Sequence, residues 1–216
     1  MDETRKITVV KIEGDTISPF AKINLIIPID KGELFIMPTD TLWGLGVSPV
    51  FPDAVKELFK VKRRPPDQPL PLLVSDMNTV EFLIGSKPSK LFTKLAGKFW
   101  PGPLTIITQS SRSFADGIAG PGGKIGLRMP KHPIAIEIID ATREKYLAVT
   151  SANRHGKPIP STVESLRKEF QKDVFLLIQS DHEMLNMPST VVDITSGKVE
   201  MIRKGALSSI EILSKI

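Results

Sequence analysis

The sequence predicts an α/β fold: a single domain in which helices cover an open, twisted, mixed sheet. The first observation behind this prediction is that short apolar or β-branched runs alternate with amphipathic segments along the whole chain. The second is that no low-complexity linker and no internal repeat interrupts the alternation. The third is length, because 216 residues suffice for one large domain with a sizeable core. We therefore expect one domain over residues 1–216.

Strands are expected where short apolar runs end at turn-forming residues. They cover residues 7–12, 33–37, 69–74, 104–108, 125–129, 146–150, 174–179, 190–194 and 199–202. Helices are expected where apolar residues recur at helical spacing. They cover residues 16–29, 53–60, 76–84, 86–99, 134–141, 161–170 and a short segment from 208. Asp53, Asp76 and Ser86 are expected to cap three of these helices, and Ser161 with Glu164 a fourth through a capping box.

Composition excludes several kinds of chemistry. The chain has 0 cysteines, which rules out disulfides, thiolate zinc sites and cysteine nucleophiles. No apolar run reaches the ~18 residues of a membrane span, and the first ten residues do not resemble a secretory signal. We therefore expect a cytoplasmic protein with no membrane association. The formal net charge of +5 suits an anionic partner such as a nucleotide or RNA, although a solvated basic surface explains it almost as well.

A polar turn follows the strand expected at 33–37 and is the first candidate for a binding site. Thr39 and Thr41 offer hydroxyls there, and Gly44 and Gly46 would let backbone amides approach a ligand. In open α/β sheets, ligands collect where strands end. An ordinary strand-to-loop turn explains the stretch about equally well. For Asp40, an Asx-type turn hydrogen bond is favoured over a magnesium contact.

Four cations lie between residues 60 and 64, just before two prolines that end the helix. Pairing with the helix dipole accounts for one or two of them better than for four. We expect Lys60 and Arg63 to be solvated and the other two, Lys62 and Arg64, to face a ligand. A glycine-rich stretch at 117–124 resembles a phosphate-binding loop but fails its spacing, because Ile118 stands where the first glycine is required.

The polar candidates for the site all fall at predicted strand or helix ends. They are Thr39, Thr41, Lys62, Arg64, Arg128, Ser151, Asn153, Ser189 and Arg203. This set consists of cations, hydroxyls and an amide, without a catalytic triad, and the three histidines lack metal-ligand spacing. Such a set binds polyanions better than it abstracts protons. It suits phosphoryl or nucleotidyl transfer, which depends on positioning and on neutralising charge around phosphorus.

Seven ordered motifs give a more specific indication. PTDTLWGLG, KVKRRPPDQPL, WPGPLT, LRMPKHP, TSANRHGKP, MPSTVVD and IRKGALS resemble the YrdC-like family of threonylcarbamoyl-AMP synthases over residues 18–210. The resemblance implies the YrdC-like fold, a twisted sheet around a basic cleft, in the short form without an extra C-terminal domain. It implies a nucleotidyltransferase that forms threonylcarbamoyl-AMP and pyrophosphate from L-threonine, bicarbonate and ATP, with Mg²⁺ carried by the ATP. A partner complex would then transfer the threonylcarbamoyl group to tRNA, and direct binding of tRNA by this chain stays open.

The resemblance also implies an ATP-binding set. Lys62 and Arg64 match the family's Lys-x-Arg signature and are expected to bind ATP and to act in catalysis by neutralising developing charge. Ser151 and Asn153 match its Ser-x-Asn signature, and Arg203 matches an arginine near the nucleotide phosphates.

A second set is implied for L-threonine. Thr41, Arg128 and Ser189 match residues that hold the amino acid, and a guanidinium suits its carboxylate. Two positions depart from the family pattern: Trp43 stands where most members have tyrosine, and Gln68 where lysine is frequent. A phosphate contact is therefore in doubt, and Lys124 or Arg63 are the candidates to replace it.

Two alternatives from other classes remain. One is a module that binds double-stranded or structured RNA in the basic cleft without catalysis. The other is a carbamoyl-transferring relative of hydrogenase-maturation proteins, which contain a similar domain. Those proteins are much longer and carry zinc-finger cysteines, and this chain has none.

Overall fold

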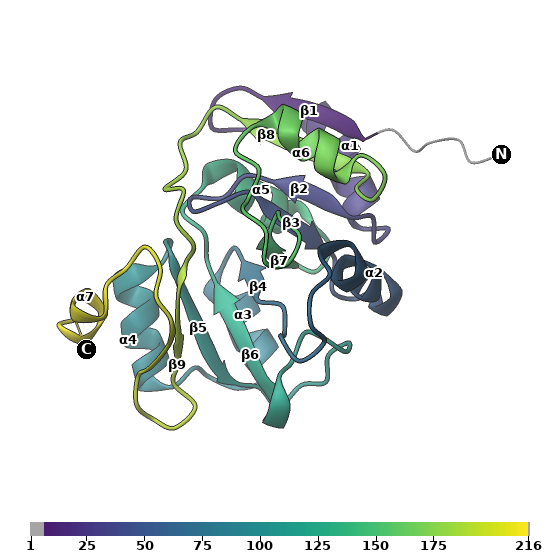
Figure 1. Ribbon diagram of the computed structural model, residues 1–216. Coiled ribbons are helices and arrows are strands. Elements are labelled where there is room, and N and C mark those ends of the chain that lie inside the picture. Colours follow the sequence, from purple (N-terminus) through teal and green to yellow (C-terminus); the bar gives the residue numbers. More distant parts are fainter. Residues whose placement is uncertain (1–6, 216) are drawn as a thin grey trace.

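The computed structural model describes residues 7–215, whose ten strands form one mixed sheet (Figure 1). The strands are β1 (Thr8–Ile12), β2 (Phe35–Met37), β3 (Gly44–Val47), β4 (Leu72–Val74), β5 (Leu104–Gln109), β6 (Lys124–Arg128), β7 (Tyr146–Ser151), β8 (Leu176–Ser180), β9 (Thr190–Asp193) and β10 (Glu200–Arg203). Their order is β1-β8-β2-β3-β7-β4-β6-β5-β9-β10. The mixed α/β sheet is confirmed. The single domain over 1–216 stays a prediction, because it includes residues 1–6 and 216, outside the described range.

Helices pack on both faces of this sheet. They are α1 (Pro19–Ile29), α2 (Pro52–Lys62), α3 (Met77–Ile84), α4 (Lys90–Phe99), α5 (Pro133–Ala141), α6 (Val163–Phe170) and α7 (Ser209–Leu213), with a short 3₁₀ helix at Pro121–Gly123. α1 and α5 contribute to the smaller of two buried apolar clusters, and the other five helices to the larger. In the described part of the chain, no helix is long and apolar enough to span a membrane.

One face of the sheet is covered over only part of its width. Leu72 and Val74 of β4 lie in the larger cluster and Leu73 in the smaller, as expected for side chains that alternate along a strand. Arg128 of β6 is the register partner of Leu73 and therefore projects from the face that carries α1 and α5. No helix lies in front of β6 and β5 in Figure 1. Arg128 of β6 and Thr105 of β5 line a cavity there.

The sequence had indicated that Gly44 and Gly46 belong to the turn, but both lie in β3. A Cβ atom at Gly44 would lie 2.6 Å from a methyl group of Val149, and one at Gly46 would lie 2.5 Å from the ring of Phe35. Contacts this short force neighbouring atoms to move. The glycines therefore let adjacent strands and their side chains approach, and the turn is limited to the residues between β2 and β3.

α2 is longer than predicted at its C-terminal end. It continues through Lys62, and Arg63 forms the left-handed cap with φ 54°. The reason is that Val61 is buried three residues after Leu58 and extends the apolar stripe of the helix. Lys62 thus starts from a helix, and the proline-stiffened loop begins after it.

The N-terminal caps were only partly predicted. The Asp76 side chain accepts a hydrogen bond from the backbone N–H of Thr79, which confirms that cap. Asp53 is not the cap of α2, because the helix begins at Pro52 and the capping position is Phe51, without a side-chain bond. Proline is favoured at the first helical position, where no N–H partner is needed.

Two further caps are shifted along the chain. α4 is capped by Ser89 and not by Ser86, and α6 has a capping box of Thr162 with Ser165 in place of the one predicted from Ser161. Neighbouring hydroxyl residues have similar cap propensities, so the position at which the apolar face begins to pack decides between them.

Candidate functional site

A polar cavity opens on the uncovered face of the sheet, at the ends of several strands. Its polar lining consists of Thr39, Thr41, Arg64, Thr105, Arg128, Thr150, Ser151, Ser189 and Arg203. Six of the eight residues predicted as ligand-binding are in this lining, and Lys62 and Asn153 are not. The cavity also has Trp43, Leu73 and Val149 in its wall, so apolar surface adjoins the cations.

The turn after β2 is closed by Thr39. Its hydroxyl oxygen accepts hydrogen bonds from the N–H groups of Thr41 and Leu42, both at 3.2 Å, and it donates to the carbonyl of Leu42 at 2.7 Å. The hydroxyls of Thr39 and Thr41 also lie 3.0 Å apart. Asp40 makes none of these turn bonds, and the Asx-type turn predicted for it is wrong.

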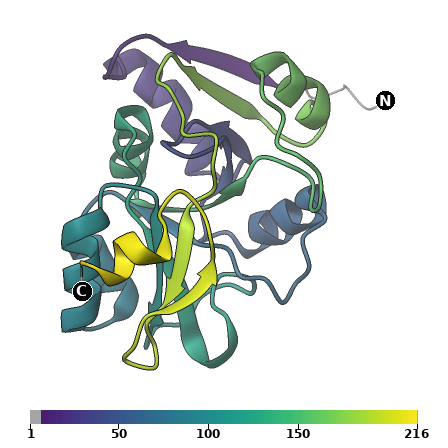
Figure 2. The same cartoon turned by 60° about the vertical axis from the view of Figure 1, so that its left-hand side comes forward.

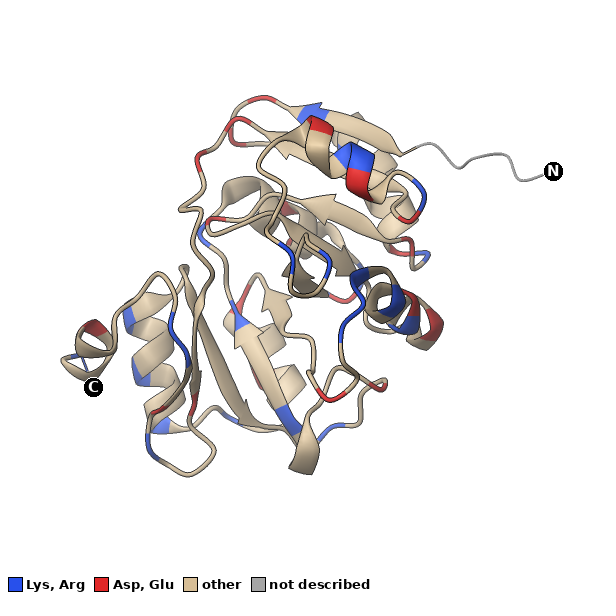
Figure 3. Cartoon of the chain, viewed as in Figure 1, with Lys and Arg blue, Asp and Glu red and all other residues tan. Residues whose placement is uncertain are grey.

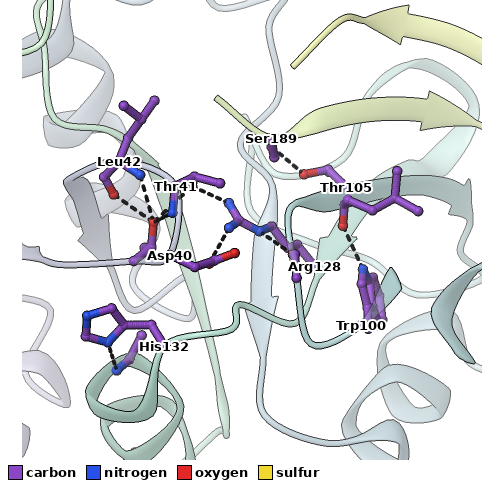
Figure 4. Close-up of polar contacts among 12 residues, drawn as sticks. Asp40, Thr41, Leu42, Trp100, Thr105, Arg128, His132 and Ser189 are labelled. Atoms are coloured by element: carbon purple, nitrogen blue, oxygen red, sulfur yellow. Dashed lines mark hydrogen bonds and ion pairs between the residues drawn. The ribbon is translucent and has the colours of Figure 1, made fainter. Parts of the chain in front are cut away.

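Asp40 instead pairs with Arg128, as Figure 4 shows. Arg128 Nη2 lies 2.5 Å from Asp40 Oδ1, Nη1 donates to the Thr41 hydroxyl at 2.8 Å, and Nε donates to the carbonyl of Gly102 at 3.0 Å. Burial lowers the pKa of Arg128, and the Asp40 carboxylate opposes that shift. A guanidinium has five N–H groups, so two remain unused at the cavity wall. The orientation of Arg128 is thus fixed from three sides, and its binding of the carboxylate of L-threonine stays a prediction.

Arg64 is half-buried, Arg203 is exposed, and both have a different environment from Arg128. Arg64 donates to the carbonyls of Gln68 at 2.8 Å and Pro69 at 3.1 Å, and Arg203 to the carbonyl of Ser189 at 2.9 Å. Neither forms an ion pair with a carboxylate within residues 7–215. Burial lowers the pKa of both, and the nearby charge of Arg203 lowers that of Arg64 further. Two uncompensated guanidiniums in one cavity favour a bound anion.

Lys62 does not line the cavity, contrary to expectation. Its amine lies 2.6 Å from the Ser151 carbonyl, 3.0 Å from the Asn153 carbonyl and 2.9 Å from Asn153 Oδ1. Burial, and then the nearby charge of Arg64, lower the pKa of Lys62 to about 7. The Asn153 amide group donates to the carbonyl of Lys157 and lines a separate hollow. In this geometry, Lys62 and Asn153 hold the turn that carries Ser151.

Ser189 and Thr105 close the opposite wall. Ser189 arrives on the connection from β8 to β9, which joins strands near opposite edges of the sheet and is held beside the first turn by a 2.9 Å bond from Leu185 N–H to the Asp40 carbonyl. Figure 2 shows the β9–β10 pair and α7, in yellow, at the edge of the sheet opposite β1. The Ser189 and Thr105 hydroxyls are 2.9 Å apart. Sequence reasoning missed Thr105, although a threonine between Leu104 and two isoleucines on β5 was a signal of a polar position facing away from the core.

A second hollow, called here the groove, adjoins the polar cavity. It passes over β5, β6, β9 and β10 and contains Gln68, Ile107 and Ile202 in its lining. Lys124, on the same lining, pairs with Asp193 at 2.8 Å. Lys124 and Arg63 were the two candidates to replace a phosphate contact at position 68. Lys124 lines the groove together with Gln68, whereas Arg63 lines hollows outside it.

The charges agree with an anionic ligand. Basic residues occur on α2 and at both ends of β6 (Figure 3). At the ends of β6, Arg128 lines the cavity and Lys124 the groove. Lys60 is 75% exposed and pairs with Glu57, which confirms its solvated position. Within residues 7–215, no three His, Cys, Asp or Glu side chains form a group that could hold a metal ion.

The chain is similar to known proteins over most of its length. The Sua5_yciO_yrdC family model, described as "Telomere recombination", matches residues 28–205. The threonylcarbamoyl-AMP synthase of Pyrococcus abyssi is 34% identical over 184 residues, 85% of this chain and 54% of that protein. The threonylcarbamoyl-AMP synthase of Pseudomonas aeruginosa is 28% identical over 171 residues, 79% of this chain and 91% of that protein.

A solved structure agrees with the fold. The crystal structure of P. abyssi Sua5 complexed with L-threonine superposes with a TM-score of 0.87 at 29% identity, covering 97% of this chain and 62% of that one. The chain thus spans about half the length of the P. abyssi relative, 54% by sequence.

Proposed function

The chain belongs to the Sua5/YciO/YrdC family, and from that premise we propose that it is an L-threonylcarbamoyladenylate synthase. The reaction joins L-threonine, bicarbonate and ATP into threonylcarbamoyl-AMP and releases pyrophosphate. The observation that carries the proposal is the cluster of three guanidiniums, Arg64, Arg128 and Arg203, with a single carboxylate, Asp40, beside the hydroxyl groups of the polar cavity. Two relatives carry the name of this activity, and P. abyssi Sua5, which has a similar structure, was solved with L-threonine.

L-threonine is assigned to the part of the cavity between Arg128 and Thr41 on one wall and Ser189 on the opposite wall. The two unused N–H groups of Arg128 match a carboxylate, and the fixed guanidinium loses little conformational entropy when it binds. The Thr41 hydroxyl oxygen accepts one hydrogen bond from Arg128 and has a second lone pair, which can accept a hydrogen bond from the substrate hydroxyl. The hydroxyl of threonine can donate a hydrogen bond to this oxygen, and a methyl group in the same position cannot.

ATP is assigned to the side formed by Arg64, Arg203 and Ser151, and extends into the groove. The two unpaired guanidiniums neutralise phosphate charge without first giving up a carboxylate. We also assign Lys62 and Asn153 to the ATP side. They hold the Ser151 turn, and Lys62 would reach a phosphate by exchanging one of its three close acceptors for a phosphate oxygen.

The reaction then needs placement more than proton transfer. The amine of threonine takes up carbon dioxide or bicarbonate to give a carbamate, and a carbamate oxygen forms a bond to the α-phosphorus while the bond to the β-phosphate oxygen breaks. Arg64 and Arg203 neutralise charge on the phosphoryl oxygens as pyrophosphate leaves. The described lining of the cavity consists of cations and hydroxyls and includes no carboxylate, so Mg²⁺ would be held there by the ATP phosphates on which it arrives. Bound there, Mg²⁺ would supply charge neutralisation on the leaving group.

The product is a mixed carbamic–phosphoric anhydride, and we propose that a threonylcarbamoyl-transfer complex uses it to modify tRNA. Assays of pyrophosphate release with ATP, bicarbonate and Mg²⁺, with and without L-threonine, test the activity. We expect release only with threonine. Release that does not depend on threonine, or structured RNA bound by a chain that releases none, would contradict the proposal and favour the RNA-binding alternative.

A further inference from the structure

The polar cavity and the groove share part of their walls. Arg64, Pro71, Thr105 and Arg203 line both. Thr105 is the one uncharged polar side chain of the four, and it is 5% exposed. Since the proposed function puts the amino acid in the cavity and the nucleotide towards the groove, the shared wall is where the two substrates meet.

The hydroxyl groups at this wall have one hydrogen without an acceptor. Arg203 Nη2 donates to the Ser189 hydroxyl oxygen at 2.9 Å, so that oxygen is an acceptor in one contact. The Ser189 and Thr105 hydroxyls contact each other at 2.9 Å, and only one of them donates in that contact. Within residues 7–215, neither side chain makes a bond to any other acceptor. The hydrogen of the other hydroxyl is therefore available for a ligand.

An available hydroxyl hydrogen on a wall that also carries the unpaired guanidiniums of Arg64 and Arg203 indicates an anionic oxygen as its acceptor. The carboxylate and the hydroxyl of threonine are already matched by Arg128 and Thr41 on the far wall. The group that must lie at the shared wall during the reaction is the carbamate. One of its oxygens attacks phosphorus, and the other becomes the carbonyl oxygen of the product. A donor there holds the carbamate in line and favours it over loss of carbon dioxide.

We propose that the Thr105 hydroxyl, paired with Ser189, is a catalytic group that donates a hydrogen bond to the carbamate oxygen formed on the amine of threonine. The proposal rests on the proposed function. No proton is transferred: the hydrogen bond forms to the oxygen that does not attack phosphorus, and it persists in the product carbonyl. Thr105 therefore affects the bicarbonate-dependent part of the reaction and leaves the binding of threonine and ATP alone largely unchanged.

Thr105→Val tests this, because valine keeps the β-branched shape and removes the hydroxyl. We expect the KM for bicarbonate to rise and kcat to fall, each by about 10-fold, while calorimetric affinities for threonine and ATP change less than about 3-fold. Thr105→Ser keeps the hydroxyl and should have a wild-type KM for bicarbonate and a wild-type kcat. Thr108→Val is the matched control, since Thr108 lies on the same strand outside both cavities and should behave as wild type.

Two results would overturn the inference: an unchanged bicarbonate KM in Thr105→Val, or loss of threonine affinity alone. The second result would make Thr105 part of amino acid recognition. If Thr105→Val does not fold, as judged by its thermal unfolding, Thr105→Ser decides, because a 10-fold higher bicarbonate KM in that variant also contradicts the proposal. Failure of the proposed function is a different result, namely no threonine-dependent pyrophosphate release by the wild type.

Discussion

Arg64 and Arg203 differ from Arg128 in having no carboxylate partner within the described chain. Charge that is not compensated inside the protein is available to stabilise phosphate oxygens as pyrophosphate departs. Arg128, in contrast, is held by Asp40, Thr41 and Gly102, which agrees with its proposed role of orienting the amino acid.

Replacing either unpaired guanidinium should therefore impair catalysis without unfolding the protein. Arg64→Ala and Arg203→Ala should each lower kcat/KM for ATP by about 10²-fold, the scale of losing one charge-stabilising donor. Steady-state pyrophosphate release measures this. Lys60→Ala, which removes an exposed cation of α2, is the control and should stay within about 2-fold of wild type. Near wild-type values for either arginine variant would show that phosphate binds elsewhere.

The sequence predicted most residues of the cavity because their hydroxyls and guanidiniums fall at strand ends. Strand ends can be predicted from the sequence, since they lie where the apolar runs stop. It did not predict where Lys62 points. Val61 decides this, because it is buried and extends α2 through Lys62, whose amine donates to Ser151 and Asn153. Thr105 was missed for a related reason: its role depends on Ser189, which comes to it from 84 residues away.

At the scale of elements, α5 begins with an unusual cap that makes the fold sensitive to pH. His132 is buried, and its Nδ1 accepts a hydrogen bond from Ala135 N–H. Burial, and then the nearby charge of His182, lower the pKa of His132 from 6.5 to about 4. His182 in turn pairs with Asp15 at 2.9 Å. Between pH 6.5 and about 4, the unfolded chain binds a proton at His132 and the folded chain does not.

The free energy of unfolding should therefore fall as the pH is lowered through this window, by at most about 3 kcal/mol from this group. His132→Asn keeps a side-chain acceptor at the cap and removes the titration. Urea unfolding at pH 7 and pH 4.5 measures the difference. We expect a smaller loss of stability in the variant than in the wild type, and equal losses in both would contradict the assignment to His132.

Two glycines in different elements give a matched pair for packing. A Cβ at Gly46 in β3 would meet the Phe35 ring, whereas nothing lies within 4 Å of one at Gly97 in α4. Gly46→Ala should lower the free energy of unfolding by about 1–3 kcal/mol through overpacking. Gly97→Ala should raise it by about 0.5–1 kcal/mol, because alanine is the better helix former. Thermal unfolding distinguishes them, and stabilisation by Gly46→Ala would show that β2 and β3 are not closely packed.

Element identity was easier to predict than element ends. Every predicted strand and helix has a counterpart in residues 7–215, because apolar periodicity reports which face is buried. Caps were misplaced where several hydroxyl or acidic residues are adjacent, as at Ser86 and Ser161, since local propensity does not distinguish neighbours. β3 was missed because Gly44 and Gly46 indicate a turn unless the side chains of Phe35 and Val149 are known to fill the space above them.

At the scale of the molecule, the site follows from an incompletely covered sheet. α1 and α5 pack on one part of a face, and the remainder carries Arg128, Thr105 and the strand ends that form the cavity and the groove. The long connection from β8 to β9 then brings Ser189 to the cavity from the other side. Sequence order alone could not predict this arrangement, because it depends on non-consecutive strands becoming neighbours.

The central claim is that this cavity joins carbamoylated threonine to AMP. Incubating the protein with ATP, L-threonine and carbon-13-labelled bicarbonate, followed by mass spectrometry of the nucleotide products, tests it most directly. The account predicts an AMP adduct that contains one labelled carbon and one threonine, formed in equal amount to pyrophosphate and absent when threonine is omitted. Pyrophosphate formed without a labelled adduct, or an adduct of AMP with threonine that lacks the label, would contradict it.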